Sequence, residues 1–324
     1  MQYTTLGRTG ITVSRLCMGT MTFGREADEA TSAALFARCR EAGINFFDCA
    51  DLYAQGASEE ILSRLARECR DELVLTSKVG FEAGMAPPNN QGLSRRHILR
   101  AVEASLRRMG TEWLDVYFCH RWDGLTPVEE TLRALDDLVR QGKVRYVGVS
   151  NWMAWQVART LGEAERLGTT PIHVLQPMYS LVKRTAEVEL LPMAQAEGLG
   201  VISYSPLGAG LLTGKYAAGV GPSEGRLNVH DMYTRRYAPV RDQGIAERFT
   251  AHAQAQGVHP VTLAIAWVKA HPAVTAPIIG ARSLEQLEPA LAAADYAMSA
   301  EERQAISDLT PPVPIATDRD EERS

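Results

Sequence analysis

Short β-rich runs that alternate with longer helical patterns constrain the fold of this chain more than any other feature. Because each helical crossover returns the chain to the same sheet, the alternation predicts parallel strands. Stretches such as 74–75 and 116–118 are apolar on both faces, as strands covered by helices must be. Eight units favour one closed (β/α)8 TIM barrel over a doubly wound sheet and over the two domains that length alone suggests. The runs lie at residues 16–19, 45–49, 73–79, 114–120, 144–150, 172–176, 200–205 and 276–280.

Two of the helical patterns carry start signals. Ser94 is expected to cap a helix whose apolar residues recur along one face over residues 98–109. Thr126 and Glu129 have the spacing of a capping box, with Pro127 at the first helical position. Both signals predict helices that cover the outside of the barrel.

About 75 residues lie beyond the roughly 250 that such a barrel requires. Residues 1–14 are typical of a β-hairpin, and residues 206–241 of a long loop rich in glycine, arginine and tyrosine. A loop of that length is usually functional in a compact domain. An extra helix with one apolar face is expected after Pro260. Residues 311–324 are Pro-rich and then charged, which leaves residues 1–310 as a single barrel domain followed by a tail.

Charge and composition exclude several classes of protein. The chain has 34 Lys and Arg residues against 39 Asp and Glu residues, so its net charge of −5 offers no basic surplus to a nucleic acid. No apolar stretch approaches the roughly 18 residues of a membrane span, and no secretory signal follows Met1. The five cysteines form no C-x-x-C pair, and the histidines form no H-x-x-x-H pair. We therefore expect a protein of the reducing cytoplasm without disulfides or a metal site.

Polar and ionisable residues end several otherwise apolar runs. In a (β/α)8 barrel the active site lies at the carboxyl ends of the strands, so these side chains are expected to converge on one pocket. A packed core has no use for them, because burying an unpaired polar group is costly. The residues at these ends are Gly19, Thr20, Asp48, Lys78, His120, Ser150, Asn151, Gln176, Tyr204, Ser205 and Gly280.

Six motifs at these strand ends resemble the signature of the aldo-keto reductases. Residues 43–53, G-I-N-F-F-D-C-A-D-L-Y, are similar to the family pattern G-x-x-x-x-D-x-A-x-x-Y. Five further motifs follow in family order, and the resemblance extends from residue 1 to about residue 296, including a hairpin that plugs the barrel bottom in this family. These five are L-T-S-K ending at Lys78, Y-F-C-H ending at His120, G-V-S-N ending at Asn151, Y-S-P-L beginning at Tyr204 and I-I-G-A-R-S around Gly280.

The resemblance implies a catalytic tetrad of Asp48, Tyr53, Lys78 and His120. It implies reduction of a carbonyl group by hydride transfer from a nicotinamide, with Tyr53 as the general acid. A free phenol titrates near about 10, and the Lys78 ammonium is expected to lower that pKa. Asp48 would keep Lys78 charged, and His120 would donate to the substrate oxygen.

Each tetrad residue also has another interpretation. Taken alone, Tyr53 is compatible with a surface tyrosine, Asp48 and Lys78 with a buried structural ion pair, and His120 with a core histidine. A strand-end lysine such as Lys78 is also compatible with a Schiff-base aldolase. A nucleotide-binding interaction subunit with little turnover is a further alternative, because the pattern also resembles the β-subunits of potassium channels.

The resemblance places NADPH across the same end of the barrel. Tyr204 would stack on the nicotinamide ring, and Arg226 would close over the pyrophosphate. Arg282 would open the last barrel helix and bind the 2′-phosphate rather than remain solvated, while Pro289 stands where the family often has Asn. No G-x-G-x-x-G motif occurs, so the expected site is not a Rossmann domain. The implied cofactor residues are Gly19, Thr20, Asp48, Ser150, Asn151, Gln176, Tyr204, Ser205, Pro206, Leu207, Gly210, Lys215, Arg226, Gly280, Arg282 and Gln286.

By analogy with the same family, the substrate pocket is expected to be aromatic and apolar. Such a rim favours a small hydrophobic aldehyde or ketone as the substrate. The leading prediction is therefore an NADPH-dependent reductase that acts on a small-molecule carbonyl compound. The rim residues implied are Met21, Thr22, Phe23, Trp122, Trp152 and the loop at 81–93.

Overall fold

Eight parallel strands close into a barrel in the computed structural model, which describes residues 1–81, 89–216, 227, 231–241 and 244–317. Neighbouring strands pair in chain order, and β10 closes the ring by pairing with both β9 and β3. The predicted (β/α)8 fold is confirmed, and each strand lies within its predicted run. The strands are β3 (Cys17–Gly19), β4 (Phe46–Asp48), β5 (Val74–Val79), β6 (Leu114–Cys119), β7 (Val144–Ser150), β8 (Ile172–Gln176), β9 (Gly200–Ser203) and β10 (Ala276–Ile279).

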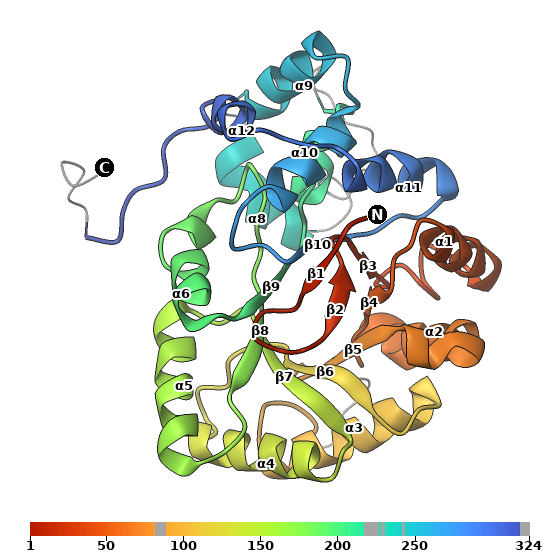
Figure 1. The fold of residues 1–324 in the computed structure, drawn as a ribbon, viewed down its shortest axis with the longest axis vertical. Coiled ribbons are helices and arrows are strands. Elements are labelled where there is room, and N and C mark those ends of the chain that lie inside the picture. Colours follow the sequence, from red (N-terminus) through yellow and green to blue (C-terminus); the bar gives the residue numbers. More distant parts are fainter. Residues whose placement is uncertain (82–88, 217–226, 228–230, 242–243, 318–324) are drawn as a thin grey trace.

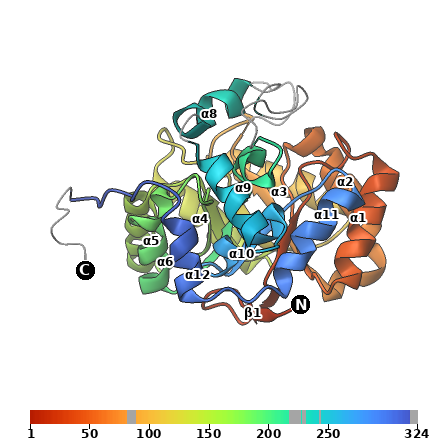
Figure 2. The same ribbon diagram turned by 90° about the horizontal axis from the view of Figure 1, so that it is seen from above.

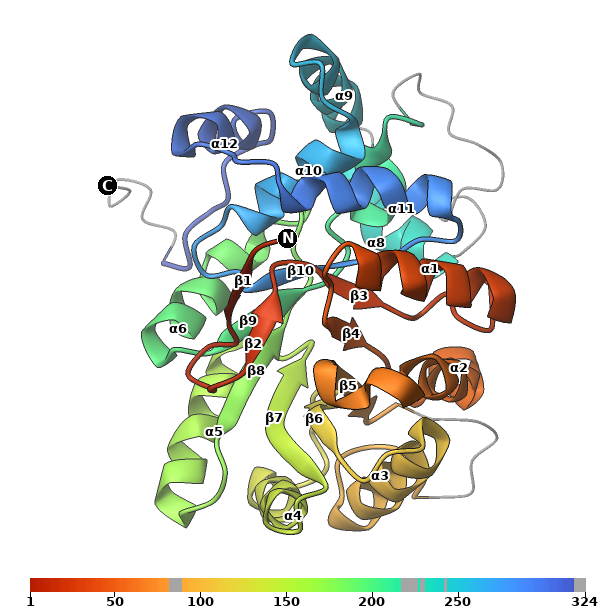
Figure 3. The same ribbon diagram turned by 45° about the vertical axis from the view of Figure 1, so that its right-hand side comes forward.

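Six helices follow β3 to β8 and cover most of the outside of the barrel (Figures 1 and 3). The strands they cover are buried on both faces; all six residues of β5, for example, are buried. Alternation along that strand places Val74, Thr76 and Lys78 on the inner face and Ser77 on the outer face. The helices are α1 (Glu29–Glu41), α2 (Ala57–Ala66), α3 (Arg95–Met109), α4 (Val128–Arg140), α5 (Ala154–Leu167) and α6 (Leu190–Glu197).

The N-terminal cap predicted for α3 is present in the structure, whereas the one predicted for α4 is absent. Ser94 caps α3 as predicted, since its hydroxyl accepts a bond from the His97 backbone N–H at 3.3 Å. The capping box expected at α4 is wrong: Pro127 is the N-cap, and no side chain caps this helix. The helix begins at Val128, so Thr126 lies one residue before the N-cap, and its hydroxyl donates to the Asp123 carboxylate at 2.7 Å instead.

The hairpin closes the bottom of the barrel. Strands β1 (Tyr3–Thr5) and β2 (Thr12–Ser14) pair antiparallel, as predicted for residues 1–14. Leu6 and Val13 are fully buried in the same cluster as the inward side chains of the strands, which include Phe118. Figure 2 shows β1 at one end of the barrel and α8 (Asp231–Arg241) at the other.

The segment expected to be a loop at residues 206–241 contains regular structure. A 3₁₀ helix, η4 (Gly208–Thr213), begins it, and α8 ends it. The expectation is wrong there because the glycines at 208 and 210 permit positive φ angles, which turn the chain tightly rather than leave it extended. Residues 217–226 and 228–230 lie outside the described part of the chain.

Four more helices complete the described chain. The helix after Pro260 is buried on every side, not on one face, because α9, α11 and β10 all pack against it. Residues 311–317 contain no helix or strand, and residues 318–324 lie outside the described range. The four helices are α9 (Ile245–Ala255), α10 (Pro260–Lys269), α11 (Leu284–Leu291) and α12 (Ala300–Ser307).

Candidate active site

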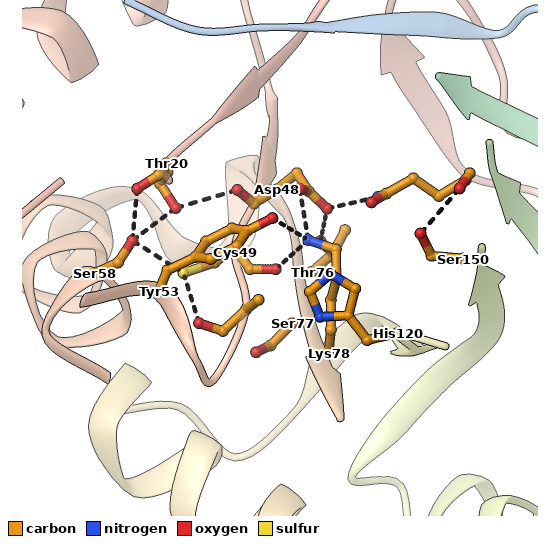
Figure 4. Close-up of polar contacts among 12 residues, drawn as sticks. Thr20, Asp48, Cys49, Tyr53, Ser58, Thr76, Ser77, Lys78, His120 and Ser150 are labelled. Carbon is orange, nitrogen blue, oxygen red and sulfur yellow. Dashed lines mark hydrogen bonds and ion pairs between the residues drawn. The ribbon is translucent and has the colours of Figure 1, made fainter. Parts of the chain in front are cut away.

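The four tetrad residues lie together at the carboxyl end of the barrel (Figure 4). Lys78 is fully buried, and its Nζ lies 2.7 Å from Asp48 Oδ2, 2.6 Å from the Cys49 carbonyl oxygen and 3.3 Å from the Tyr53 hydroxyl. Asp48 ends β4 and Lys78 lies near the end of the neighbouring strand β5, so barrel closure brings the two side chains into contact. The sequence positions therefore converge as the strand-end argument expects.

The Asp48 carboxylate is held by three donors. Its Oδ1 accepts bonds from the Thr76 hydroxyl at 2.8 Å and from Gln176 Nε2 at 2.9 Å, while Oδ2 accepts from Lys78. A buried ion pair is tolerated when the remaining lone pairs are satisfied in this way. The result is a fixed ammonium beside the Tyr53 oxygen.

Burial raises the pKa of Tyr53 to about 12, although the Lys78 ammonium acts to lower it. The expected net lowering by Lys78 is therefore not observed, because desolvation of the phenolate outweighs the attraction of the ammonium. The pKa of Lys78 lies above its usual value: burial lowers it, but Asp48 and Tyr53 together raise it more. At neutral pH the site holds a protonated phenol and a charged ammonium.

His120 stands directly after β6, with its ring centroid 6.2 Å from that of Tyr53 and 4.9 Å from that of Phe81. Burial and the positive charges of Lys78 and Arg121 hold the pKa of His120 well below its usual value. The ring is therefore neutral at neutral pH. Its Nδ1 is buried without a hydrogen-bond partner among the described residues.

A continuous hydrogen-bond chain joins the ends of β6 to β9. Ser150 Oγ donates to the Gln176 carbonyl oxygen at 2.9 Å, and Asn151 Nδ2 donates to the His120 carbonyl oxygen at 2.9 Å. The Tyr204 hydroxyl donates to Asn151 Oδ1 at 2.6 Å. The structure thus connects the amide and hydroxyl groups expected around a nicotinamide to Asp48 through Gln176.

The other expected cofactor residues differ in burial and in hydrogen bonding. Thr20 is buried and donates its hydroxyl to the Asp48 carbonyl oxygen at 3.1 Å, so it fixes the backbone at Asp48. Arg282 is exposed and precedes Ser283, the N-cap of α11, rather than standing inside the helix. The Arg282 backbone N–H donates to Gln286 Oε1 at 3.3 Å. Arg226, which is expected to close over the pyrophosphate, lies outside the described residues.

Glycine and loop positions supply the rest of that set. Gly19 is half-buried, and an added Cβ there would lie 2.7 Å from a methyl carbon of Ile278. Gly280 is exposed. Five further residues lie from the end of β9 to the residues just after η4, namely Ser205, Pro206, Leu207, Gly210 and Lys215.

The expected substrate rim is only partly formed. Phe23 is fully buried in the hydrophobic core, so it does not reach the rim. Thr22 is also buried and donates its hydroxyl to the Ala281 carbonyl oxygen at 2.9 Å. Met21 and Trp122 are half-buried, and Trp152 packs edge-on against Trp122 at 4.7 Å between centroids. Residues 82–88 of the loop at 81–93 lie outside the described range.

Two exposed side chains beside this rim escaped the sequence reasoning. Trp155 is 55% exposed and lies 5.9 Å from Trp122 between centroids, and Met153 is 61% exposed. Both lie in the first turn of α5 or directly before it, three to five residues beyond the end of β7. Including the first helical turn after each strand would have found them.

Two negative findings apply to the described residues. No helix in that part of the chain is long and apolar enough to cross a membrane. No group of three or more His, Cys, Asp or Glu side chains there could hold a metal ion.

A model of the aldo/keto reductase family matches residues 15–310. The chain belongs to the aldo/keto reductase family. This aldo/keto reductase is 38% identical over 302 residues to a probable voltage-gated potassium channel subunit beta of Oryza sativa subsp. japonica, which covers 91% of this chain and 92% of that protein. It is 37% identical over 323 residues to the uncharacterized oxidoreductase YrpG of Bacillus subtilis, covering 96% of each chain. It is 34% identical over 317 residues to the norsolorinic acid reductase of Aspergillus flavus, covering 93% and 79% respectively.

Proposed function

We propose that this chain reduces an aldehyde or ketone to the alcohol with NADPH, and that Tyr53 donates the proton. The contact of Lys78 with both Asp48 and the Tyr53 hydroxyl, beside a neutral His120, carries this proposal. When bound, NADPH supplies the hydride. The carbonyl oxygen gains negative charge as its carbon is reduced, so it requires a proton and fixed donors.

Each tetrad residue has one task in this proposal. Tyr53 is protonated at neutral pH and gives its proton to the substrate oxygen. Lys78 stabilises the phenolate that remains, because its ammonium lies 3.3 Å from the phenol oxygen. Asp48 holds Lys78 in place, and the neutral His120 ring donates to the substrate oxygen. A charged Lys78 is a poor nucleophile, which disfavours the aldolase alternative.

The residues at the carboxyl end of the barrel fit a nicotinamide dinucleotide. Asn151 and Gln176 offer amides, Tyr204 offers an aromatic face, and Arg282 offers an exposed cation just before α11 for the 2′-phosphate. Residues 206–241, including Lys215 and Arg226, would cover the cofactor within one domain spanning residues 1–310. Fluorescence titration with NADPH and with NADH measures the preference that Arg282 should give.

The proposed substrate is a small hydrophobic carbonyl compound, and the enzyme would work in the cytoplasm. Half-buried Trp122 and Met21 supply apolar surface, the exposed Trp155 extends it, and the buried Trp152 supports Trp122 from below. Aromatic side chains contribute large apolar contact area to a ligand. An aromatic aldehyde is therefore a suitable first probe.

Replacing Tyr53 by Phe tests the proposal. We expect Tyr53→Phe to lower kcat for 4-nitrobenzaldehyde by about 10² to 10⁴-fold, because proton donation is lost, while NADPH still binds. The measurement is NADPH oxidation beside a fluorescence titration. Tyr3→Phe, on the exposed hairpin, should keep wild-type turnover. Wild-type turnover in Tyr53→Phe would contradict the proposal.

A second candidate is an NADPH-binding interaction subunit with little turnover. The 38% identity to a protein named as a potassium channel subunit beta favours it. The two candidates differ in kcat and in cofactor-dependent binding to a partner. A high kcat with no difference between pull-downs made with and without NADPH supports the enzyme, and the opposite pair of results supports the subunit.

A further inference from the structure

The turn that carries Tyr53 has an unusual backbone. Three consecutive residues of η1 (Tyr53–Gly56) lie in the left-handed region, with φ angles of 47° at Ala54, 56° at Gln55 and 95° at Gly56. Such a conformation is strained for a non-glycine residue and persists only where neighbouring contacts hold it. The position of the Tyr53 hydroxyl therefore depends on what packs against this turn.

Arg108, from the last turn of α3, packs against it. A Cβ added to Gly56 would lie 2.7 Å from Arg108 Cδ, so the arginine side chain occupies the space beside this glycine. Arg108 Nε donates to Glu59 Oε2 at 2.6 Å, and Glu59 lies in the first turn of α2, directly after the left-handed turn. The ion pair thus connects the turn to α3.

Glu59 also connects the turn to the strand that carries Lys78. Its side chain is fully buried, and its Oε1 accepts a bond from the Ser77 hydroxyl at 2.5 Å. Ser77 faces out of the barrel and Lys78 faces in, so adjacent residues of β5 contact Glu59 and Tyr53 respectively. Through these two bonds the Glu59 carboxylate links α2 to both α3 and β5.

The surroundings make Arg108 electrostatically important. Asp51 Oδ1 and the Tyr117 hydroxyl are buried there without hydrogen-bond partners among the described residues. The Asp51 carboxyl interacts with the charges of Glu59, Arg108 and Lys78. Without Arg108, Lys78 would be the remaining cation that acts on Asp51 among the described residues, and that cation is already bound to Asp48.

We propose that Arg108 and Glu59 are positioning residues that hold the Tyr53 hydroxyl against Lys78. Neither side chain contacts the reacting atoms; both act through the left-handed turn. This inference rests on the proposed role of Tyr53 as proton donor. Small displacements of a catalytic group lower rates by up to about 10²-fold, so loss of the pair slows proton transfer. The proposed cofactor contacts lie mainly on β7 to β10, so cofactor affinity is unaffected.

A double-mutant cycle tests this inference. Arg108→Ala is expected to lower kcat by about 10- to 100-fold in the native background, but by less than about twofold in a Tyr53→Phe background. The NADPH dissociation constant stays within about twofold, and Arg108→Lys recovers part of the rate. Equal-fold losses in both backgrounds, or wild-type kcat in Arg108→Ala, would overturn the inference.

The Arg70–Asp115 ion pair provides a matched control. Its atoms lie 2.8 Å apart, and each side chain is 14% exposed, but it contacts the base of β5 and β6 rather than the Tyr53 turn. Arg70→Ala should lower Tm without lowering kcat. If Arg108→Ala does not fold, Glu59→Gln keeps the side-chain shape and enters the same cycle, with the same difference between backgrounds expected.

The same data separate the two proposals. Full turnover in Tyr53→Phe defeats the proposed function and the inference together. Loss of turnover in Tyr53→Phe with wild-type kcat in Arg108→Ala and Glu59→Gln defeats the positioning role alone.

Discussion

Asp48 and Asp51 are three positions apart, yet their carboxyl groups have opposite surroundings. Three donors hold the Asp48 carboxylate, from Thr76, Lys78 and Gln176. Asp51 is equally buried, but its Oδ1 has no partner among the described residues. Burial, and then the Glu59 carboxylate, raise the pKa of Asp51 to about 7. One of these carboxyl groups serves the site as an anion, and the other titrates near neutral pH.

The raised pKa of Asp51 predicts a pH-dependent stability. Between about pH 4 and pH 7 the folded state retains a proton that the unfolded state has lost, so this contribution to stability disappears as the pH rises through that window. Asp51→Asn removes the titration. Relative to wild type, the variant should gain about 2 to 3 kcal/mol of unfolding free energy between pH 5 and pH 8, because about two pH units of the titration lie in that range at about 1.4 kcal/mol each. Urea unfolding of both proteins at each pH measures this difference, and a pH-independent difference would contradict it.

Sequence reasoning at the residue scale succeeded where position follows from the strand ends. Asp48, Lys78 and His120 converge because parallel strands end at one rim. The net pKa shift of Tyr53 could not be predicted, because it depends on how far the phenol is buried by distant residues. The Glu59–Arg108 contact joins positions 49 residues apart and leaves no local signal.

At the scale of elements, α3 illustrates what a single cap contributes. Its first turn is basic, which is unfavourable at a helix N-terminus, and two acceptors offset this: the Ser94 hydroxyl accepts from the His97 backbone N–H, and the Glu130 carboxylate accepts from the Arg95 backbone N–H at 2.9 Å. Ser94→Ala should lower the unfolding free energy by about 1 kcal/mol, whereas Ser94→Gly should cost only a few tenths. Chemical denaturation measures both. Equal losses in the two variants would show that the cap does not contribute in this way.

Element prediction failed where tertiary contacts decide the outcome. The cap expected at Thr126 does not form, because α4 begins one residue later than expected and the Thr126 hydroxyl bonds to Asp123 in the preceding loop. The composition of residues 206–241 favours a loop, yet η4 and α8 form within it. The helix after Pro260 is expected to bury one apolar face, but the elements packed around it bury every face. Hydrophobic periodicity and composition describe one element of the sequence at a time. These outcomes depend on the other elements that pack against it.

For the whole molecule, the hairpin that closes the core and the proposed active site lie at opposite ends of the barrel. Leu6, in the hairpin, is fully buried at the bottom of the barrel, and the tetrad lies at the carboxyl ends of the strands. Leu6→Ala should therefore lower the unfolding free energy by about 2 to 5 kcal/mol while leaving kcat of the folded protein unchanged. Leu125→Ala is the control, since that side chain is 95% exposed and should change neither. A marked fall in kcat for Leu6→Ala at a temperature where it is folded would contradict this separation.

Closure of the ring has a consequence for synthesis of the chain. Cys17 of β3 pairs with Ile278 of β10, so the first barrel strand cannot complete its pairing until the last strand has been synthesised. At 5 to 20 residues per second, the intervening chain takes roughly 13 to 50 s to emerge from a ribosome. Throughout that time one edge of β3 is unpaired, and the hairpin faces an incomplete cavity. Nascent copies on one messenger are then exposed to edge-to-edge association, and chaperones that shield this edge would raise the yield of active protein.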